Sequence, residues 1–197
     1  MKILLTHFNV FGSGSINSSA CAAKLVRAPQ DCELTVCELP TEYERSVTLL
    51  EQLIGEHRPD ALIMLGQAEG RPTLSLERIG INCDDAGAAD NTGEIRSGSK
   101  IVPDGADGYF AALPIREMLQ AACDANVPAS ISNSAGTYVC NHLLYKMLYN
   151  RNRDGSPRYV GFIHVPAAPQ QAVAKPIPSM DSQLAANGIS AMLTALK

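Results

Sequence analysis

The sequence predicts an α/β fold in which helices cover both faces of a mainly parallel sheet. Short apolar segments alternate with amphipathic ones along most of the chain, which is the strand–helix–strand order of such folds. Hydrophobic residues make up 46% of the chain and charged residues 18%, so we expect a packed core rather than disorder. The length of 197 residues suits one domain over 1–197.

Six segments are expected to be strands because they are short and mostly apolar, and turn residues bound several of them. They cover residues 2–8, 34–39, 60–65, 76–82, 129–133 and 159–165. The first leads into a flexible turn at Gly12-Ser13-Gly14-Ser15, and Gly66 is expected to end the third.

Five segments are expected to be helices, and they cover residues 17–26, 42–57, 114–125, 140–150 and 180–196. Asn17 begins the first of these as a capping residue. Apolar residues of the second helix share one face: Val47, Leu50, Leu53 and Ile54. The stretches 84–108, 151–158 and 167–178 are expected to be irregular, and the first has the length typical of a functional loop.

The charge pattern excludes several classes of partner. The net charge is −4 and no basic run occurs, so we expect no nucleic-acid partner. The apolar stretches are too short to cross a bilayer, so we expect no membrane partner. The residues after Met1-Lys2 lack a signal-peptide pattern, and we expect a cytoplasmic protein.

The six cysteines indicate thiols rather than a metal site. They are Cys21, Cys32, Cys37, Cys83, Cys123 and Cys140. No C-x-x-C pair occurs, which disfavours zinc and thioredoxin-type sites. In a reducing compartment most are expected to be free and buried, although disulfides between subunits stay open.

Cys140 differs from the other cysteines because it follows a strand and a glycine-containing turn and begins a helix. A helix N-terminus carries partial positive charge and free N–H groups. We therefore expect a lowered thiol pKa and backbone donors for an oxyanion beside the sulfur. A merely buried cysteine is the alternative.

His164 lies near the end of the strand YVGFIHV, where catalytic groups gather in parallel sheets. It could accept the thiol proton and return it to a leaving amine, although a core histidine is the commoner case. His142 is the competitor, but two residues from Cys140 on one helix it should point away from that thiol.

Glu77 lies in an apolar segment, where a carboxylate is costly unless it is paired. A protonated histidine is one partner that would explain it, as the third member of a triad. A salt bridge to the neighbouring Arg78 is the other.

Several segments together resemble the pyroglutamyl peptidase I family, also called pyrrolidone-carboxylate peptidases. The similar segments are THFNVFGS, LGQAEGR, LERIGIN, SNSAGTYVCN, GFIHVP and PSM, in the family's order along nearly the whole chain. SNSAGTYVCN is similar to the family's S-x-x-A-G-T-Y-x-C-N, which is strongly specific.

The resemblance implies a three-layer α/β/α sandwich with a mixed sheet, called phosphorylase/hydrolase-like, and commonly a homotetramer. It implies a cysteine peptidase that acts on peptides with an N-terminal pyroglutamate and needs no cofactor or metal. Cys140 would be the nucleophile, His164 the general base and Glu77 the residue that orients His164.

The resemblance also implies a pocket for the pyroglutamyl lactam. Its expected residues are Phe8, Phe11, Asn17, Thr41, Gln67, Tyr138 and Val139. A flat, uncharged lactam suits an apolar slot with a few amide hydrogen bonds. Core packing is an equal alternative for Phe8.

The chain departs from the family pattern at four positions. His7, Val10 and Ser13 replace a glycine, a proline and a glycine, and Gly87 replaces an arginine near the oxyanion. These departures leave two alternatives open: a related cysteine amidohydrolase with another substrate, or a binder of lactam groups without catalysis.

Overall fold

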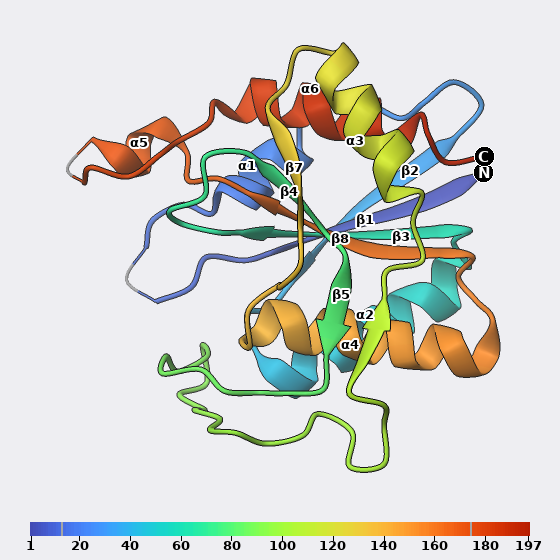
Figure 1. The fold of residues 1–197 in the computed structure, drawn as a ribbon, viewed down its shortest axis with the longest axis vertical. Coiled ribbons are helices and arrows are strands. Elements are labelled where there is room, and N and C mark those ends of the chain that lie inside the picture. The colour runs from blue at the N-terminus through green and yellow to red at the C-terminus, as the bar shows by residue number, and fades with distance from the viewer. Residues whose placement is uncertain (13, 174) are drawn as a thin grey trace.

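A six-stranded sheet forms the centre of the computed structural model, which describes residues 1–12, 14–173 and 175–197 (Figure 1). Ser13, expected in the first turn, lies outside the described residues. In spatial order the strands are β2 (Glu33–Leu39), β1 (Lys2–Phe8), β3 (Ala61–Gln67), β8 (Tyr159–Val165), β4 (Leu74–Glu77) and β7 (Ala129–Ser132).

The sheet is mixed, with one change of strand direction. β2, β1, β3 and β8 are parallel to one another, and β4 and β7 are parallel to each other. β4 runs antiparallel to β8, with Ser75 opposite His164. The predicted mainly parallel sheet is confirmed.

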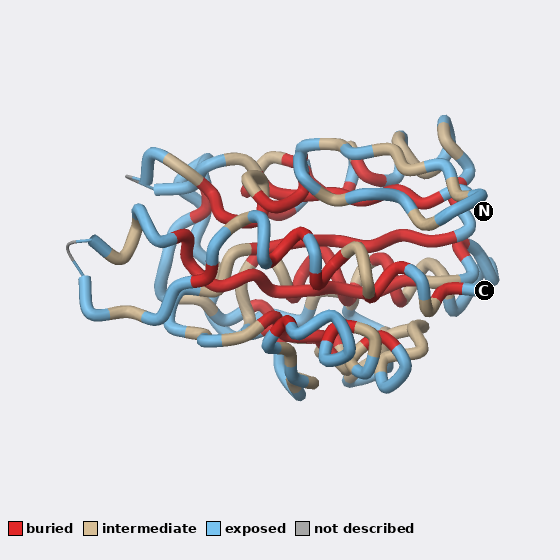
Figure 2. Tube along the Cα trace, turned by 90° about the horizontal axis from the view of Figure 1, so that it is seen from above, coloured by how far each residue is buried: buried red, intermediate tan, exposed pale blue. Residues whose placement is uncertain are grey.

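Helices cover both faces of the sheet, as predicted (Figure 1). On one face lie α1 (Ser18–Ala23), α3 (Ile115–Asp124) and α6 (Ser182–Leu193), and on the other lie α2 (Tyr43–His57) and α4 (Val139–Asp154). Ile63 belongs to the first core and Leu62 to the second, because successive strand residues face opposite sides. Buried residues therefore run continuously along the central strands (Figure 2).

The predicted strand 76–82 is wrong, because two strands replace it. β4 ends at Glu77, and β5 (Ile79–Ile81) pairs instead with β6 (Gly108–Phe110), a strand the sequence did not predict. The chain leaves the main sheet at Arg78, whose N–H donates to the carbonyl of Ser132. β5 then packs on α4, which partly buries Ile79 and Ile81 outside the main sheet.

Other expected boundaries also moved. β3 passes through Gly66 to Gln67, since its backbone continues to pair with β8. α4 extends to Asp154, so the first half of the expected surface turn 151–158 is helical, and Gly155 with φ of +73° ends it. A short helix, α5 (Pro169–Ala172), lies in the expected loop 167–178.

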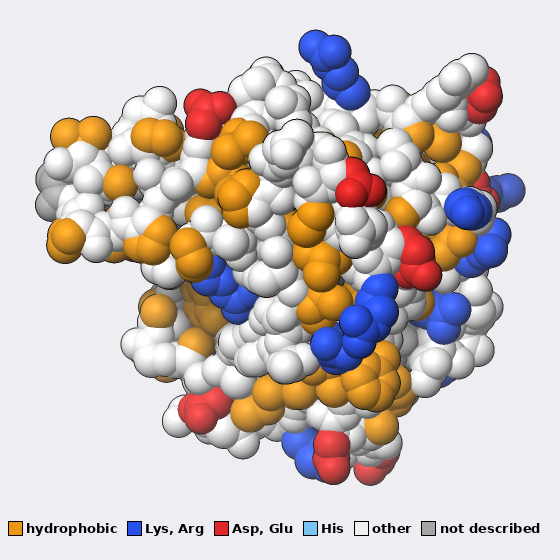
Figure 3. Space-filling model, turned by 45° about the horizontal axis from the view of Figure 1, so that its top comes forward, with side chains coloured by type: hydrophobic (Ala, Val, Ile, Leu, Met, Phe, Trp, Pro, Cys, Tyr) orange, Lys and Arg blue, Asp and Glu red, His pale blue; other side chains and the backbone are white. Residues whose placement is uncertain are grey.

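The face shown in Figure 3 carries acidic and basic side chains interspersed with polar and hydrophobic atoms. Among the described residues, no helix combines the length and apolar character that crossing a membrane requires.

Candidate active site

Cys140 is the second residue of α4, directly after a tight turn. Gly136 adopts φ of +80°, a conformation that favours glycine. Thr137 fixes the turn against the loop at Asp85: its hydroxyl donates to the Asp85 carbonyl over 2.6 Å, and the Asp85 N–H donates to its carbonyl. The first N–H groups of α4, which begins at Val139, have no acceptor within the helix.

Asn141 holds this helix start in place, and the sequence analysis missed it. Its side-chain oxygen accepts from the N–H of Ile81, and its amide donates to the carbonyls of Ile81 and Cys83. Asn141 is completely buried. Its position at the end of the SNSAGTYVCN segment was the available signal.

The thiol of Cys140 lies against β3 at a strand position that has no side chain. A Cβ atom on Gly66 would lie 3.0 Å from Cys140 Sγ and 2.8 Å from the ring of Phe162. Gly66 is the strand partner of His164 in β8. Paired residues of neighbouring strands face the same side, so His164 points to the face on which the thiol lies.

Glu77 and His164 form a buried pair in which His164 Nδ1 is 2.7 Å from Glu77 Oε1. Glu77 is fully buried and His164 is nearly so. A second partner is Arg71, whose Nη1 lies 2.5 Å from the same oxygen and whose Nη2 donates to the Ser134 carbonyl. The alternative pairing with Arg78 is therefore not the one found.

Arg71 had no assigned role in the sequence analysis, although it ends the segment LGQAEGR. The sequence position of Arg71 did not reveal this role, because Arg71 lies in the segment before β4 and only the fold brings its side chain to Glu77.

Cys140 and His164 do not meet because their preceding strands end at the same edge of the sheet. β7 runs antiparallel to β8, because β7 is parallel to β4 and β4 is antiparallel to β8. Their carboxyl ends therefore point to opposite edges of the sheet. The loop 133–138 returns the chain across the sheet face, and this return brings Cys140 to Gly66.

Burial dominates the protonation of the site. It raises the pKa of the Cys140 thiol to about 12, helped by the negative charge of Glu77. The expected lowering of this pKa by the helix N-terminus is thus wrong. Burial also lowers the pKa of His164, although Glu77 acts in the opposite sense. Burial is the largest influence on Glu77 and opposes its ionisation, but the hydrogen bonds to His164 and Ser132 and the charges of His164 and Arg71 together lower the Glu77 pKa.

His142 faces away from the thiol, as expected. Its Nδ1 lies 2.8 Å from Asp84 Oδ2, and Arg96 Nη1 lies 2.8 Å from the same oxygen. The Arg96 guanidinium also stacks over the Tyr43 ring at 4.3 Å. This buried cluster fixes the loop that contacts the start of α4.

A small cavity of about 40 Å³ opens beside the thiol. Cys140 lines it together with six of the seven expected pocket residues: Phe8, Phe11, Asn17, Thr41, Gln67 and Tyr138. Val139, the seventh, is fully buried in the core between the sheet and α4 and does not line the cavity. Phe8 has both of the roles considered for it, because it packs in that core and also lines the cavity.

Asn9 organises the cavity wall, and the sequence analysis did not name it. Its Oδ1 accepts from the backbone N–H of Thr41 over 2.9 Å and from the Asn91 amide. Its carbonyl accepts from the Asn17 amide over 2.9 Å. Asn17 also caps α1, as predicted, by accepting from the N–H of Ser19.

The described departures from the family pattern lie outside the cavity lining. His7 is buried, and β-strand alternation points it to the sheet face opposite to Phe8. Val10 and Gly87 are exposed, and a Cβ on Gly87 would meet no atom within 4 Å.

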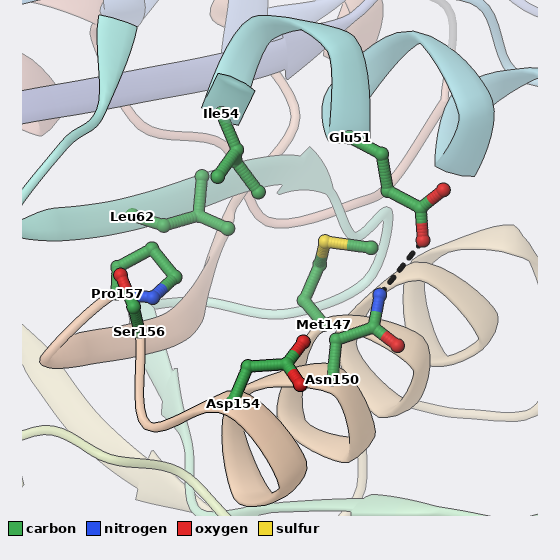
Figure 4. Close-up of a pocket in the computed structure, with 8 residues that line it drawn as sticks. All are labelled: Glu51, Ile54, Leu62, Met147, Asn150, Asp154, Ser156 and Pro157. Atoms are coloured by element: carbon green, nitrogen blue, oxygen red, sulfur yellow. Dashed lines mark hydrogen bonds between the residues drawn. The ribbon is translucent and has the colours of Figure 1, made fainter.

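A larger pocket of about 220 Å³ lies between α2 and α4 (Figure 4). Ile54, Leu62 and Met147 form its apolar side, and Glu51 accepts a hydrogen bond from the Asn150 amide at its rim. It contains none of the expected site residues.

Comparisons with known proteins agree on one family. Residues 1–197 match the family model described as pyroglutamyl peptidase. The chain is 43% identical to a pyrrolidone-carboxylate peptidase of Alkaliphilus oremlandii, covering 99% of this chain and 92% of the relative. The identity to the Thermosipho africanus protein of that name is 41%, covering 100% and 96%.

Solved structures of the same kind share the fold. A pyroglutamyl peptidase I from Bacillus amyloliquefaciens superposes with a TM-score of 0.95 at 32% identity, covering 98% of this chain and 93% of that one. A mutant pyrrolidone carboxyl peptidase from Pyrococcus furiosus gives 0.94 at 34% identity, covering 99% and 97%.

Proposed function

This chain belongs to the pyroglutamyl peptidase family, as its motifs predict, and from that premise we propose that Cys140, His164 and Glu77 remove an N-terminal pyroglutamyl residue from peptides. The chain is a cysteine hydrolase by its family. The observation that carries the residue assignment is the cavity whose wall contains both Cys140 and six expected lactam-binding residues.

The reaction begins with a neutral thiol and a neutral imidazole, because burial disfavours the charged form of each. Cys140 Sγ attacks the pyroglutamyl carbonyl carbon while its proton passes to His164 Nε2. The resulting imidazolium donates from Nδ1 to Glu77, and the ionised carboxylate stabilises its charge.

The tetrahedral intermediate then collapses to a thioester. His164 donates the proton to the departing amine, and the C–N bond breaks. Water, deprotonated by the same imidazole, attacks the thioester and releases pyroglutamate with the thiol restored. Backbone N–H groups of the first turn of α4 would stabilise both oxyanions, because no carbonyl precedes them in the helix to accept their hydrogen bonds.

Glu77 needs Arg71 for this role. Without a partner, burial would raise the pKa of the carboxyl group. The group would then be neutral and could not stabilise the positive charge of an imidazolium. Arg71 supplies a permanent positive charge at 2.5 Å and is itself tied to the turn through Ser134.

We also propose a cytoplasmic homotetramer. All six cysteines are free thiols, which fits a reducing compartment. Exposed apolar side chains at Ile95, Phe110 and Val173 are candidates for burial between subunits. Sedimentation at several protein concentrations tests the assembly, and a monomer at all of them would contradict it.

Hydrolysis of pyroglutamyl-aminomethylcoumarin tests the function. Wild-type protein should release the fluorophore, prolyl-aminomethylcoumarin should not react, and Cys140→Ala should show no turnover above buffer. Cys37→Ala is the matched control, since it removes another partly buried thiol outside the site. Equal turnover by wild type and Cys140→Ala would reject the proposal.

A further inference from the structure

A second, larger hollow adjoins the small cavity at the end of the sheet where β3 and β8 finish. It has a volume of about 510 Å³, and we call it the exit groove. Gln67 and Glu69 line it from the segment at the end of β3, and Gln171 and Lys175 line it from the segment after β8. Phe11 and Ile16 form the facing wall.

The exit groove and the small cavity are continuous at two side chains. Phe11 and Gln67 line both spaces. A ligand held in the small cavity with its reactive carbon at Cys140 therefore meets the exit groove as soon as it passes Gln67.

The amide of Gln67 has a fixed orientation at this boundary. Its Oε1 accepts from the backbone N–H of Ser18 over 2.8 Å and from the Gln171 amide over 3.1 Å. Gln171 is held in turn, because its Oε1 accepts from the N–H of Ala168 over 2.8 Å. Two donors on one oxygen leave Nε2 of Gln67 as the donor offered to a peptide carbonyl.

The strand register places the exit groove next to the leaving group. Gly66, which touches the thiol, pairs with His164, and the next pair is Gln67 with Val165. The departing amine must lie beside His164 to receive its proton. The chain attached to that amine therefore begins one strand position from the exit groove.

The far part of the exit groove carries opposite charges. Lys175 Nζ lies 2.9 Å from Glu69 Oε1, and both side chains are largely exposed, 61% and 45%. A pair this accessible to water contributes little to stability, so its charges remain available to a ligand.

We propose that the exit groove binds the residues that follow pyroglutamate, and that Glu69 and Lys175 select among them by charge. This inference rests on the proposed function, because the position of the amine comes from the role of His164. The substrate class is peptides with a polar or charged residue after pyroglutamate. An acidic side chain would contact Lys175 and a basic one would contact Glu69.

Charge reversal tests the selection. The substrates are pyroglutamyl-lysine, pyroglutamyl-glutamate and pyroglutamyl-aminomethylcoumarin, which has no charged side chain. Lys175→Glu should raise the ratio of kcat/KM for the lysine dipeptide over that for the glutamate dipeptide about tenfold. Glu69→Lys should lower this ratio by a similar factor. Each variant changes kcat/KM for both dipeptides severalfold in opposite directions, which is the size expected for exposed charge pairs. Both shifts should shrink in 0.5 M salt, because the charges are exposed.

Lys197→Glu is the matched control. It makes the same charge change as Lys175→Glu at Lys197, the exposed last residue, at the end of the molecule opposite α5 (Figure 1). It should leave unchanged both the dipeptide ratio and the turnover of the coumarin substrate.

The outcomes separate this inference from the function it rests on. Turnover of the coumarin substrate with unshifted dipeptide ratios overturns the charge selection and leaves the function standing. The same ratio shift in Lys197→Glu also overturns it, because a long-range charge effect would then explain the result. No turnover of any substrate by wild type overturns the function and this inference together.

Discussion

At the scale of single residues, the buried thiol and imidazole determine how activity depends on pH. His164 must be neutral to accept a proton, and its lowered pKa keeps it neutral down to pH values below the ordinary histidine pKa of about 6.5. The Cys140 pKa of about 12 places thiol ionisation beyond the working range. We expect kcat/KM to fall only on the acid side, with a midpoint below about 6.5, and to stay level up to pH 9. A stopped assay across this range checks it, and an acid midpoint above 6.5 would contradict it.

Arg71 lies outside the proposed triad but contacts Glu77, so its removal should disturb the triad strongly. Arg71→Ala leaves the fully buried Glu77 with His164, a neutral imidazole before reaction, as its only ion-pair partner among the residues described. We expect turnover to fall at least tenfold and unfolding free energy to fall by about 3 kcal/mol, the cost of breaking a buried ion pair. Steady-state kcat and denaturant unfolding measure the two effects. The acid midpoint of kcat/KM should also rise, because the charge of Arg71 lowers the His164 pKa. An unchanged acid midpoint would show that Arg71 acts only on stability.

A substitution at Gly87 is expected to increase kcat. It stands where the family has an arginine, and a side chain there meets open space. One restored oxyanion donor should raise kcat of Gly87→Arg by roughly tenfold or more. Ala88→Arg adds the same charge one residue away and should leave kcat unchanged. Equal effects of both variants would assign the change to net charge.

At the scale of elements, the contact between β3 and the start of α4 sets the position of the nucleophile. Gly66→Ala places a methyl group 2.8 Å from Phe162 and 3.0 Å from Cys140 Sγ, so one of them must shift. We expect kcat/KM to fall about a hundredfold, since displacements near 1 Å cost that much.

Gly55→Ala provides the matched control for that prediction. Gly55 lies on the exposed side of α2, and a methyl group there meets no atom within 4 Å. Replacing a helical glycine should add about 1 kcal/mol of stability and leave kcat/KM unchanged. Retained activity in Gly66→Ala would mean that the thiol is not held against β3.

The elements also show which parts of the fold the sequence could predict. Apolar runs such as YVGFIHV predict buried strands well, because both faces of the sheet are covered. The sequence prediction merged β5 with β4 and missed β6. These two strands pair with each other about 30 residues apart and pack against α4, which a local pattern does not reveal. The same limit applied to the site. Motifs indicated Cys140 and His164 as candidates, whereas Arg71 and Asn9 make contacts that only the folded chain creates.

At the scale of the whole molecule, the binding features form a path along one end of the sheet. Cys140 lines the small cavity that we propose for the lactam, and the exit groove leads away from this cavity past Gln67. The chain termini and the pocket between α2 and α4 lie toward the other end (Figures 1 and 4). This separation explains why the termini could carry changes, such as the Lys197 control, without reaching the reaction.

Labelling with a pyroglutamyl chloromethyl ketone tests the central claim most directly, because it requires both lactam recognition and a nucleophile beside the cavity. The thiol displaces chloride and forms a thioether, which peptide mass mapping locates. We predict one label per chain, on Cys140 alone, with turnover lost in proportion and labelling slowed by free pyroglutamate. A label on another cysteine that tracks the loss of activity, or full turnover after Cys140 is labelled, would contradict the account.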